Sequence, residues 1–229
     1  MSTTNTQTHY GSVAKSFHWL TALLIFTVIP LGVIAHNMSL EIIAGNTASE
    51  YVARTALLFS LHKTVGICIF FVALARIAWA LSQPKPKALN GDNWLETMAA
   101  QTMHWLLYGS LVLVPLTGWI HHAATSGFAP IFWPFGQTLP FVPESEAVAD
   151  AFAGLHMTFE RVMVFAFLLH LAGALKHVII DRDKTLARML PGTPELSALP
   201  RQIKSKLPIV AALGVWAIAL AIGTSHGLY

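Results

Sequence analysis

Charged residues are scarce in this chain: Asp, Glu, Lys and Arg make up 11% of the 229 residues, whereas 55% are hydrophobic. Because a soluble domain usually carries about 25% charged residues, this composition excludes an ordinary soluble enzyme and a disordered chain. The single cysteine, Cys68, excludes an intramolecular disulfide, a cysteine-rich zinc site and a thiolate-bound iron–sulfur cluster. Glycine-rich phosphate loops, HExxH and GxSxG motifs are absent from the sequence, so nucleotide and hydrolase chemistry have little support.

Apolar stretches dominate what is there, and the mean hydropathy is +0.59. A helix that spans a bilayer needs about 20 mainly apolar residues. Five stretches meet or approach this length, namely residues 17–35, 57–81, 102–121, 155–180 and 208–223. The sequence therefore predicts an all-α integral membrane helix bundle, with a four-helix core and a fifth, C-terminal transmembrane helix.

Basic residues predict the orientation of these helices. Of the fourteen Lys and Arg residues, eleven lie in the N-terminal segment, near the ends of the second and fourth stretches, or in the loops that follow these two stretches. The other three are Arg54, Lys63 and Arg161, on the opposite side. Because basic loops stay in the cytoplasm, we expect a cytoplasmic N-terminus and, after five crossings, a periplasmic C-terminus. This asymmetry explains the net charge of +3 better than binding to nucleic acid would.

The histidines are unusually numerous, eleven against eleven carboxylates. His156 and His170 lie fourteen residues apart on the fourth stretch, so they share one helix face and differ by about 21 Å in depth. His18 starts the first stretch at the depth expected for His170, and His62 starts the second at the depth expected for His156. Two pairs are therefore predicted, His18 with His170 and His62 with His156.

Two imidazoles per site are too few for a structural zinc ion, which takes four ligands. They are the number that a haem needs, because its macrocycle supplies the other four nitrogens and the imidazoles fill both axial positions. The pairs therefore predict two haem b groups, with iron that passes electrons and has no free position for oxygen. A rival scheme takes its ligands from histidines that lie eighteen residues apart on one helix face, His18 and His36 on the first stretch and His104 and His122 on the third. It separates them by about 27 Å, which would put its ligands at the wet edges of the bilayer, so we favour the first scheme.

These residues resemble the bacterial cytochrome b561 family. The similarity covers about residues 10–192 and rests on His18-Trp19, Leu61-His62-Lys63-x-x-Gly66, His156, the segment 170–177 and the tail Asp183-Lys-Thr-Leu-x-Arg188-Met-Leu-Pro191. The resemblance implies that His18, His62, His156 and His170 are haem ligands in the same crosswise pairing. It also implies a di-haem domain over residues 1–192, a bacterial inner membrane, and oxidation of superoxide coupled to reduction of ubiquinone. Residues 193–229 would then be a linker and an additional helix.

Other basic and imidazole side chains are candidates for the substrate sites. Arg76 lies fourteen residues after His62 and would pair with an inner haem propionate or a quinone oxygen, or simply anchor the helix. His177, seven residues after His170, would protonate a quinone or be an interfacial histidine. Lys63 and Arg161 flank the outer pair and would attract a propionate or an anionic donor, although acidic residues in the outer loop oppose this.

Further histidines have less specific expectations. His104 is placed like His177, at the inner start of its helix, and is a weaker candidate for the same role. His36, His121 and His122 are expected to lie at the membrane interface.

Two alternatives to a self-contained oxidoreductase remain open. The chain could be a b-type cytochrome subunit that anchors, and carries electrons for, a separate periplasmic or membrane redox partner. It could also be a transporter with a histidine proton relay, but paired repeats and broken helices, which that class needs, are not seen in the sequence. The expected partners are membrane lipid and quinone, with a possible periplasmic redox protein.

Overall fold

A computed structural model describes residues 2–125, 129–132, 136–196 and 198–226. It contains five long helices, each long and apolar enough to cross a membrane, which confirms the predicted all-α membrane bundle. No strand occurs among the residues described. The helices are α1 (Ser12–Ile43), α2 (Ser49–Ser82), α3 (Trp94–Ala124), α4 (Glu146–Lys176) and α5 (Leu207–His226), with a π-helical turn η1 (His177–Asp181) directly after α4.

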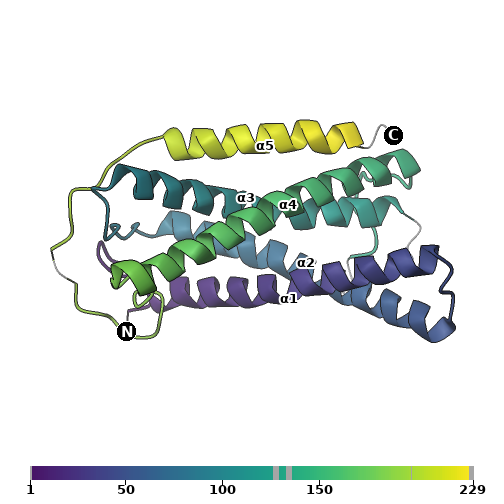
Figure 1. Ribbon diagram of the computed structural model, residues 1–229, viewed down its shortest axis with the longest axis horizontal. Helices are drawn as coiled ribbons and strands as arrows, with labels where there is room; N and C mark the ends of the chain where they lie inside the picture. The colour runs from purple at the N-terminus through teal and green to yellow at the C-terminus, as the bar shows by residue number, and fades with distance from the viewer. Residues whose placement is uncertain (1, 126–128, 133–135, 197, 227–229) are drawn as a thin grey trace.

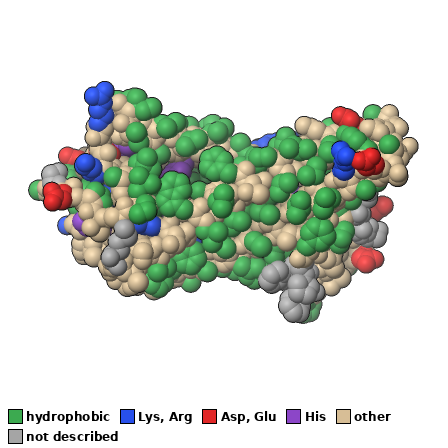
Figure 2. Space-filling view, turned by 90° about the horizontal axis from the view of Figure 1, so that it is seen from below, with side chains coloured by type: hydrophobic (Ala, Val, Ile, Leu, Met, Phe, Trp, Pro, Cys, Tyr) green, Lys and Arg blue, Asp and Glu red, His purple; other side chains and the backbone are tan. Residues whose placement is uncertain are grey.

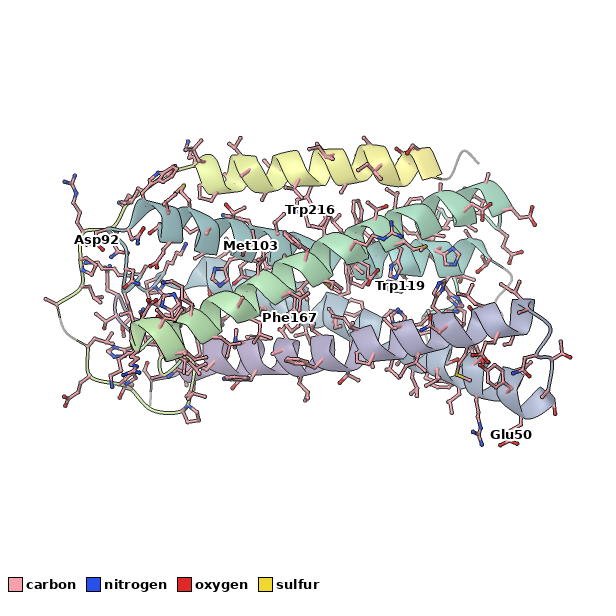
Figure 3. All side chains as sticks on the ribbon, viewed as in Figure 1. Glu50, Asp92, Met103, Trp119, Phe167 and Trp216 are labelled. Carbon is pink, nitrogen blue, oxygen red and sulfur yellow. The ribbon has the colours of Figure 1, made fainter. Side chains whose placement is uncertain are left out.

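The helices run alternately up and down, so that α1 begins and α5 ends at opposite ends of the bundle (Figure 1). We call the end where α1 begins the inner end and the opposite end the outer end. Glu50, at the start of α2, and Asp92, just before α3, mark the outer and inner ends respectively (Figure 3). α5 packs only against α3 and α4 among the described elements and lies on the side away from α1.

Local sequence sets several helix ends. The Asn93 side chain accepts a hydrogen bond from the Glu96 amide at 3.3 Å and starts α3, and Ser145 caps α4 in the same way. Such side-chain acceptors satisfy amides that have no partner within the helix. α4 ends through η1, after which Arg182 adopts a left-handed conformation with φ 51°. This break turns the chain away from the helix axis at the inner end.

The surface suits a lipid environment. Helices α1 to α4 have 31 to 34 residues and are therefore about 46 to 51 Å long, which exceeds the roughly 30 Å hydrocarbon core. On the face seen in Figure 2, hydrophobic side chains cover the middle and most charged side chains gather near the two ends. Large apolar side chains in the middle of the helices are exposed, for example Leu23, Phe165 and Ile218. Lipid tails would cover them.

A gap separates α1 and α2 from α4. Among the described residues, no Cα atom of α1 or α2 lies within 8 Å of a Cα atom of α4. The α1–α2 hairpin instead contacts the remaining helices closely through α2 and α3. A small apolar cluster of Ile25, Val28, Ile69 and Leu111 joins these three helices. The space toward α4 is spanned by side chains, and the paired histidines are among them.

Candidate functional site

The structure brings together the four histidines that the depth argument paired. His18 of α1 lies beside His170 of α4, and His62 of α2 lies beside His156 of α4; the ring centroids are 6.2 Å apart in both pairs. All four side chains are half-buried. Each pair therefore joins the α1–α2 hairpin to α4 across the gap, one pair toward the inner end and one toward the outer end. Among the described residues, neither His36 nor His122 makes a ring contact with another histidine, so the structure gives the eighteen-residue scheme no outer pair.

The outer pair is held by backbone carbonyls. His62 Nδ1 lies 3.0 Å from the Val28 carbonyl oxygen of α1, and His156 Nδ1 lies 2.9 Å from the Val114 carbonyl oxygen of α3. A carbonyl oxygen only accepts hydrogen bonds, so Nδ1 carries the proton in both rings. The lone pair of each imidazole is therefore on Nε2, the nitrogen that remains available to a metal.

The inner pair has different surroundings. His104 of α3 packs edge-on against His170, with ring centroids 5.2 Å apart, and Trp19 packs edge-on against His18 at 5.3 Å. The Arg76 guanidinium lies over the Tyr108 ring, 5.3 Å from its centroid. Arg76 is also near enough to His18 and His170 to act on them electrostatically. The predicted position of Arg76 at the level of the inner pair agrees with this placement.

The histidine pairs fit a six-coordinate haem iron. Two metal–imidazole bonds of about 2 Å each, together with the distance from each nitrogen to its ring centre, span about 6 Å, which agrees with the observed 6.2 Å. A Cβ atom built on Gly66, one turn after His62, or on Gly173, three residues after His170, would meet no atom within 4 Å. Space is therefore open beside both pairs.

Lys63 ties down the outer loop, which we define as the described residues 129–132 and 136–145. Its Nζ donates to the Ala129 carbonyl at 2.9 Å and lies 3.2 Å from His122 Nδ1. The other ring nitrogen of His122 lies 3.2 Å from Gln137 Oε1. His122 is only 3% exposed, because the outer loop folds back over it. Lys63 has no carboxylate partner among the described residues.

His177 belongs to a small ionic cluster at the inner end. Its Nδ1 lies 2.8 Å from Asp183 Oδ2 and 3.1 Å from Asp181 Oδ2. Burial opposes ionisation of Asp183, but hydrogen bonds from Thr185 and His177 outweigh it and lower the pKa of this carboxyl group. The three side chains could reach one metal ion, but Lys176 already pairs with Asp181 at 2.7 Å, which disfavours a cation there. The cluster is better suited to fixing the orientation of the His177 ring.

The inner end is closed by segments far apart in the sequence. Arg188 is 5% exposed, donates to the Lys87 and Thr8 carbonyls at 2.9 and 2.6 Å, and lies over the Tyr10 ring. Burial raises the pKa of Tyr10, and the positive charge of Arg188 offsets this only in part. Lys15 donates to the Leu190 and Gly192 carbonyls at 2.8 and 2.7 Å. We call residues 2–11, 84–88 and 182–194 together the inner cap.

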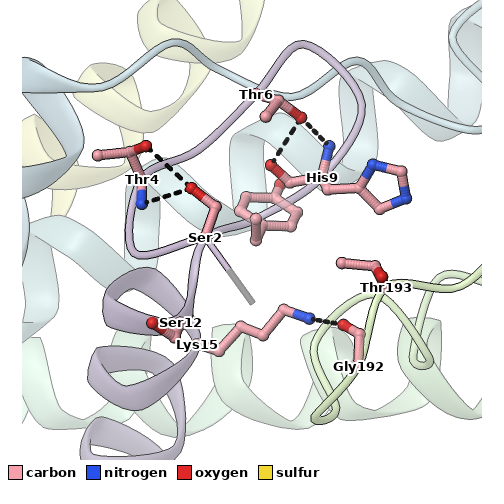
Figure 4. Close-up of a pocket in the computed structure, with 9 residues that line it drawn as sticks. Ser2, Thr4, Thr6, His9, Ser12, Lys15, Gly192 and Thr193 are labelled. Carbon is pink, nitrogen blue, oxygen red and sulfur yellow. Dashed lines mark hydrogen bonds between the residues drawn. The ribbon is translucent and has the colours of Figure 1, made fainter.

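A pocket of about 100 Å³ lies within the inner cap (Figure 4). Hydrogen bonds between Ser2 and Thr4 and between Thr6 and His9 shape its wall. None of the paired histidines lines it. We therefore regard it as a packing space inside the cap and separate from the histidine pairs.

Sequence reasoning missed several contacts of the site. The carbonyl partners Val28 and Val114 carry no signal in their side chains, and Arg188 was noted only as part of a basic tail. The proximity of His104 to His170 could have been anticipated, because both were placed near the inner level. Arg161 is exposed, and the structure gives it no contact with the outer pair among the described residues.

Five membrane helices and two histidine pairs between them define a multi-pass membrane protein of the kind that holds metal cofactors between its helices. Residues 9–192 match the family described as prokaryotic cytochrome b561. The chain belongs to this family, and it is therefore a membrane electron-transfer protein of a family that binds haem b. The family match ends before α5 begins.

Individual relatives agree with this assignment. The chain is 30% identical over 190 residues to "Cytochrome b561 homolog 2" of Escherichia coli (strain K12), covering 83% of this chain and 95% of the relative. It is 25% identical over 185 residues to "Probable superoxide oxidase CybB" of Yersinia pestis, covering 80% of this chain and 96% of the relative. "Cytochrome b561 homolog 1" of Escherichia coli (strain K12) is 28% identical over 130 residues, which cover 57% of this chain and 73% of that relative.

Proposed function

We propose that this protein oxidises an electron donor on the periplasmic side of the bacterial inner membrane and reduces ubiquinone near the cytoplasmic side. The observation that carries the proposal is the presence of two histidine pairs, one in each half of the bundle, with the same centroid separation of 6.2 Å. His18 and His170 would hold one haem b and His62 and His156 the other. Bound there, each haem would supply an iron that takes up and releases one electron without binding oxygen.

The outer end would receive the donor. Lys63 lies next to His62 in the chain and carries a positive charge without a carboxylate partner among the described residues. A positive charge at this place attracts an anion. Superoxide is the donor we favour, and it is the one named for the Yersinia pestis relative at 25% identity. Two superoxide anions would each lose one electron and leave as dioxygen.

The inner end would reduce the quinone. Ubiquinone takes up two electrons and two protons to become ubiquinol, so a proton donor is required beside the electron path. His177 lies seven residues, about 10 Å, beyond His170 along the helix and is positioned by Asp183 at 2.8 Å. We propose that His177 delivers protons from the cytoplasm and that Arg76 binds a quinone oxygen or an inner haem propionate. Asp183 would hold the His177 ring in place.

We infer the orientation from the distribution of basic residues, which predicts that the inner end lies in the cytoplasm and the C-terminus in the periplasm. A second candidate function is that of an electron-carrying subunit for a separate redox protein. The observation that favours it is α5, an additional helix long and apolar enough to cross the membrane, which lies outside the family match. Purification from the native membrane distinguishes the two, because a subunit brings a stoichiometric partner with it.

Haem content and electron flow test the proposal. The purified protein should contain two haems b per chain by pyridine haemochrome assay, and the His62→Ala and His170→Ala variants one each. The matched control is His36→Ala, an exposed histidine on α1. Under anaerobic conditions, superoxide should reduce the haem α-band and added ubiquinone should reoxidise it. A colourless protein, or one with a single haem, would refute the two-site proposal, and a di-haem protein that superoxide leaves oxidised would refute the donor.

A further inference from the structure

The outer histidines and the helices beside them share a repeated arrangement. Each outer imidazole approaches a valine carbonyl, and a glycine follows that valine by four residues: Val28 and Gly32 on α1, Val114 and Gly118 on α3. Residues four apart lie on the same face of a helix, so each glycine is directly beside the carbonyl that the imidazole reaches. α1 therefore contacts His62, and α3 contacts His156, through the same arrangement of a valine carbonyl and a glycine four residues later.

The absence of a side chain at both glycines is what admits the imidazoles. A Cβ atom on Gly32 would lie 2.7 Å from Cε1 and 2.9 Å from Nδ1 of His62. A Cβ atom on Gly118 would lie 2.9 Å from both the Cε1 and Nδ1 atoms of His156. These distances are shorter than carbon atoms tolerate, so any side chain would push the ring away from the carbonyl.

The inner pair is built without this arrangement. Within the described part of the chain, neither His18 nor His170 forms a hydrogen bond to a backbone carbonyl, and both instead contact aromatic rings edge-on. The two pairs have the same centroid separation and differ in what holds the Nδ1 atoms. The difference is therefore in the ligand chemistry and not in the spacing.

We propose that Gly32 and Gly118 are positioning residues that admit His62 and His156 to carbonyl hydrogen bonds and thereby lower the reduction potential of the outer site. The inference rests on the proposed function, since it assumes a haem at each pair. A ligand imidazole that donates its second N–H to a carbonyl is fixed in orientation and becomes more basic. A more basic ligand set favours the ferric state, which makes the outer site the better donor to the inner one. Each glycine thus acts through the histidine beside it.

Alanine at these glycines tests the proposal. Gly32→Ala and Gly118→Ala should raise one of the two midpoint potentials and shift one of the two low-spin ferric signals in electron paramagnetic resonance. An effect of about tenfold on the ferric–ferrous equilibrium corresponds to about 59 mV for one electron. The matched control is Gly109→Ala on α3, where a Cβ atom would be equally close, 2.7 Å, to the Trp216 ring. Gly214→Ala, with open space around it, controls for helix propensity.

A second variant keeps the test decisive if an alanine variant loses the outer haem. The Thr117 hydroxyl donates to the Leu113 carbonyl at 2.7 Å and to the Val114 carbonyl at 3.0 Å, so it shares the acceptor of His156. Thr117→Val removes this competing donor without adding bulk and should lower the same potential that Gly118→Ala raises. Equal shifts of both potentials, or no shift in either glycine variant, would overturn the inference. A wild-type protein without two haems would instead refute the proposed function.

Discussion

Arg188 is the residue whose loss should most clearly open the inner end of the protein. It is 5% exposed and joins three segments of the inner cap, through the Thr8 and Lys87 carbonyls and the Tyr10 ring. Replacement by Met keeps most of the apolar volume and removes the guanidinium. The two carbonyls then lose their donor and the Tyr10 ring loses its cation. We expect the N-terminal segment to separate from the cap while the helices stay folded.

The magnitude follows from these contacts. A hydrogen bond from a charged group contributes about 1.5 to 3 kcal/mol, and a desolvated cation–π contact about 2 kcal/mol. Water compensates part of this loss once the cap opens, so we expect a net cost of about 3 kcal/mol. Because every 1.4 kcal/mol changes an equilibrium tenfold, opening of the cap should become about 100-fold more frequent.

Amide hydrogen exchange followed by mass spectrometry measures this opening directly. Peptides that cover residues 2–10 and 84–90 should exchange about 100-fold faster in Arg188→Met, including the Lys87 amide that donates to Gln7 at 2.9 Å. Peptides from the middle of α3 should keep their exchange rates. Lys184→Met is the control, because it removes the same charge from an exposed side chain four residues earlier. Equal exchange in the two variants would refute the role given to Arg188.

Three further predictions concern other parts of the fold. Trp216→Ala removes the ring that packs on α4 and should cost about 3 kcal/mol, seen as a lower Tm in detergent, while Leu213→Ala at an exposed position of α5 leaves Tm unchanged. The lowered pKa of Asp183 means that its stabilising effect is present above the ordinary carboxyl pKa of 3.8 and is lost as the pH falls through the lower value of the folded protein. The Tm difference between wild type and Asp183→Asn should therefore shrink as the pH falls below about 4, and a constant difference would contradict the His177 contact. Lys63→Met should increase proteolytic cleavage in the outer loop by about tenfold, because its hydrogen bond to the Ala129 carbonyl of that loop contributes about 1.5 kcal/mol, and unchanged cleavage would contradict this.

Much of this fold could be predicted because it depends on apolar length. Runs of about 20 apolar residues indicate spans without any detail of packing, whereas the direction inferred from the basic loops stays a prediction. The helices extend beyond the apolar runs, however, as α2 shows by starting at Ser49 where the run starts at residue 57. Polar residues continue the helix outside the hydrocarbon core, and hydropathy does not register them.

The histidine pairs could also be anticipated without any detail of packing, because the depth of a residue along a straight helix follows from its position in the sequence. That each pair binds a haem iron stays a prediction. The sequence could not predict contacts between distant segments. The burial of His122 depends on a loop that folds back over it. The hydrogen bonds of His62 and His156 to backbone carbonyls depend on how closely α1 approaches His62 and α3 approaches His156. Glycine at positions 32 and 118 is visible in the sequence, but its meaning requires the neighbouring helix.

The gap between the α1–α2 hairpin and α4 bears on how the protein is assembled. α1 and α2 pack against each other, and the backbone of this hairpin comes close to the remaining helices only where α2 packs on α3. The α1–α2 hairpin and the group of α3, α4 and α5 can therefore form separately within the membrane. A cofactor held as proposed, by one imidazole from each half, would then be a cross-link between them. Its binding free energy adds to the stability of the assembled bundle by mass action, so loading and the last folding step become one event. Shortage of the cofactor would accordingly be seen first as separation of the hairpins, before any helix unfolds.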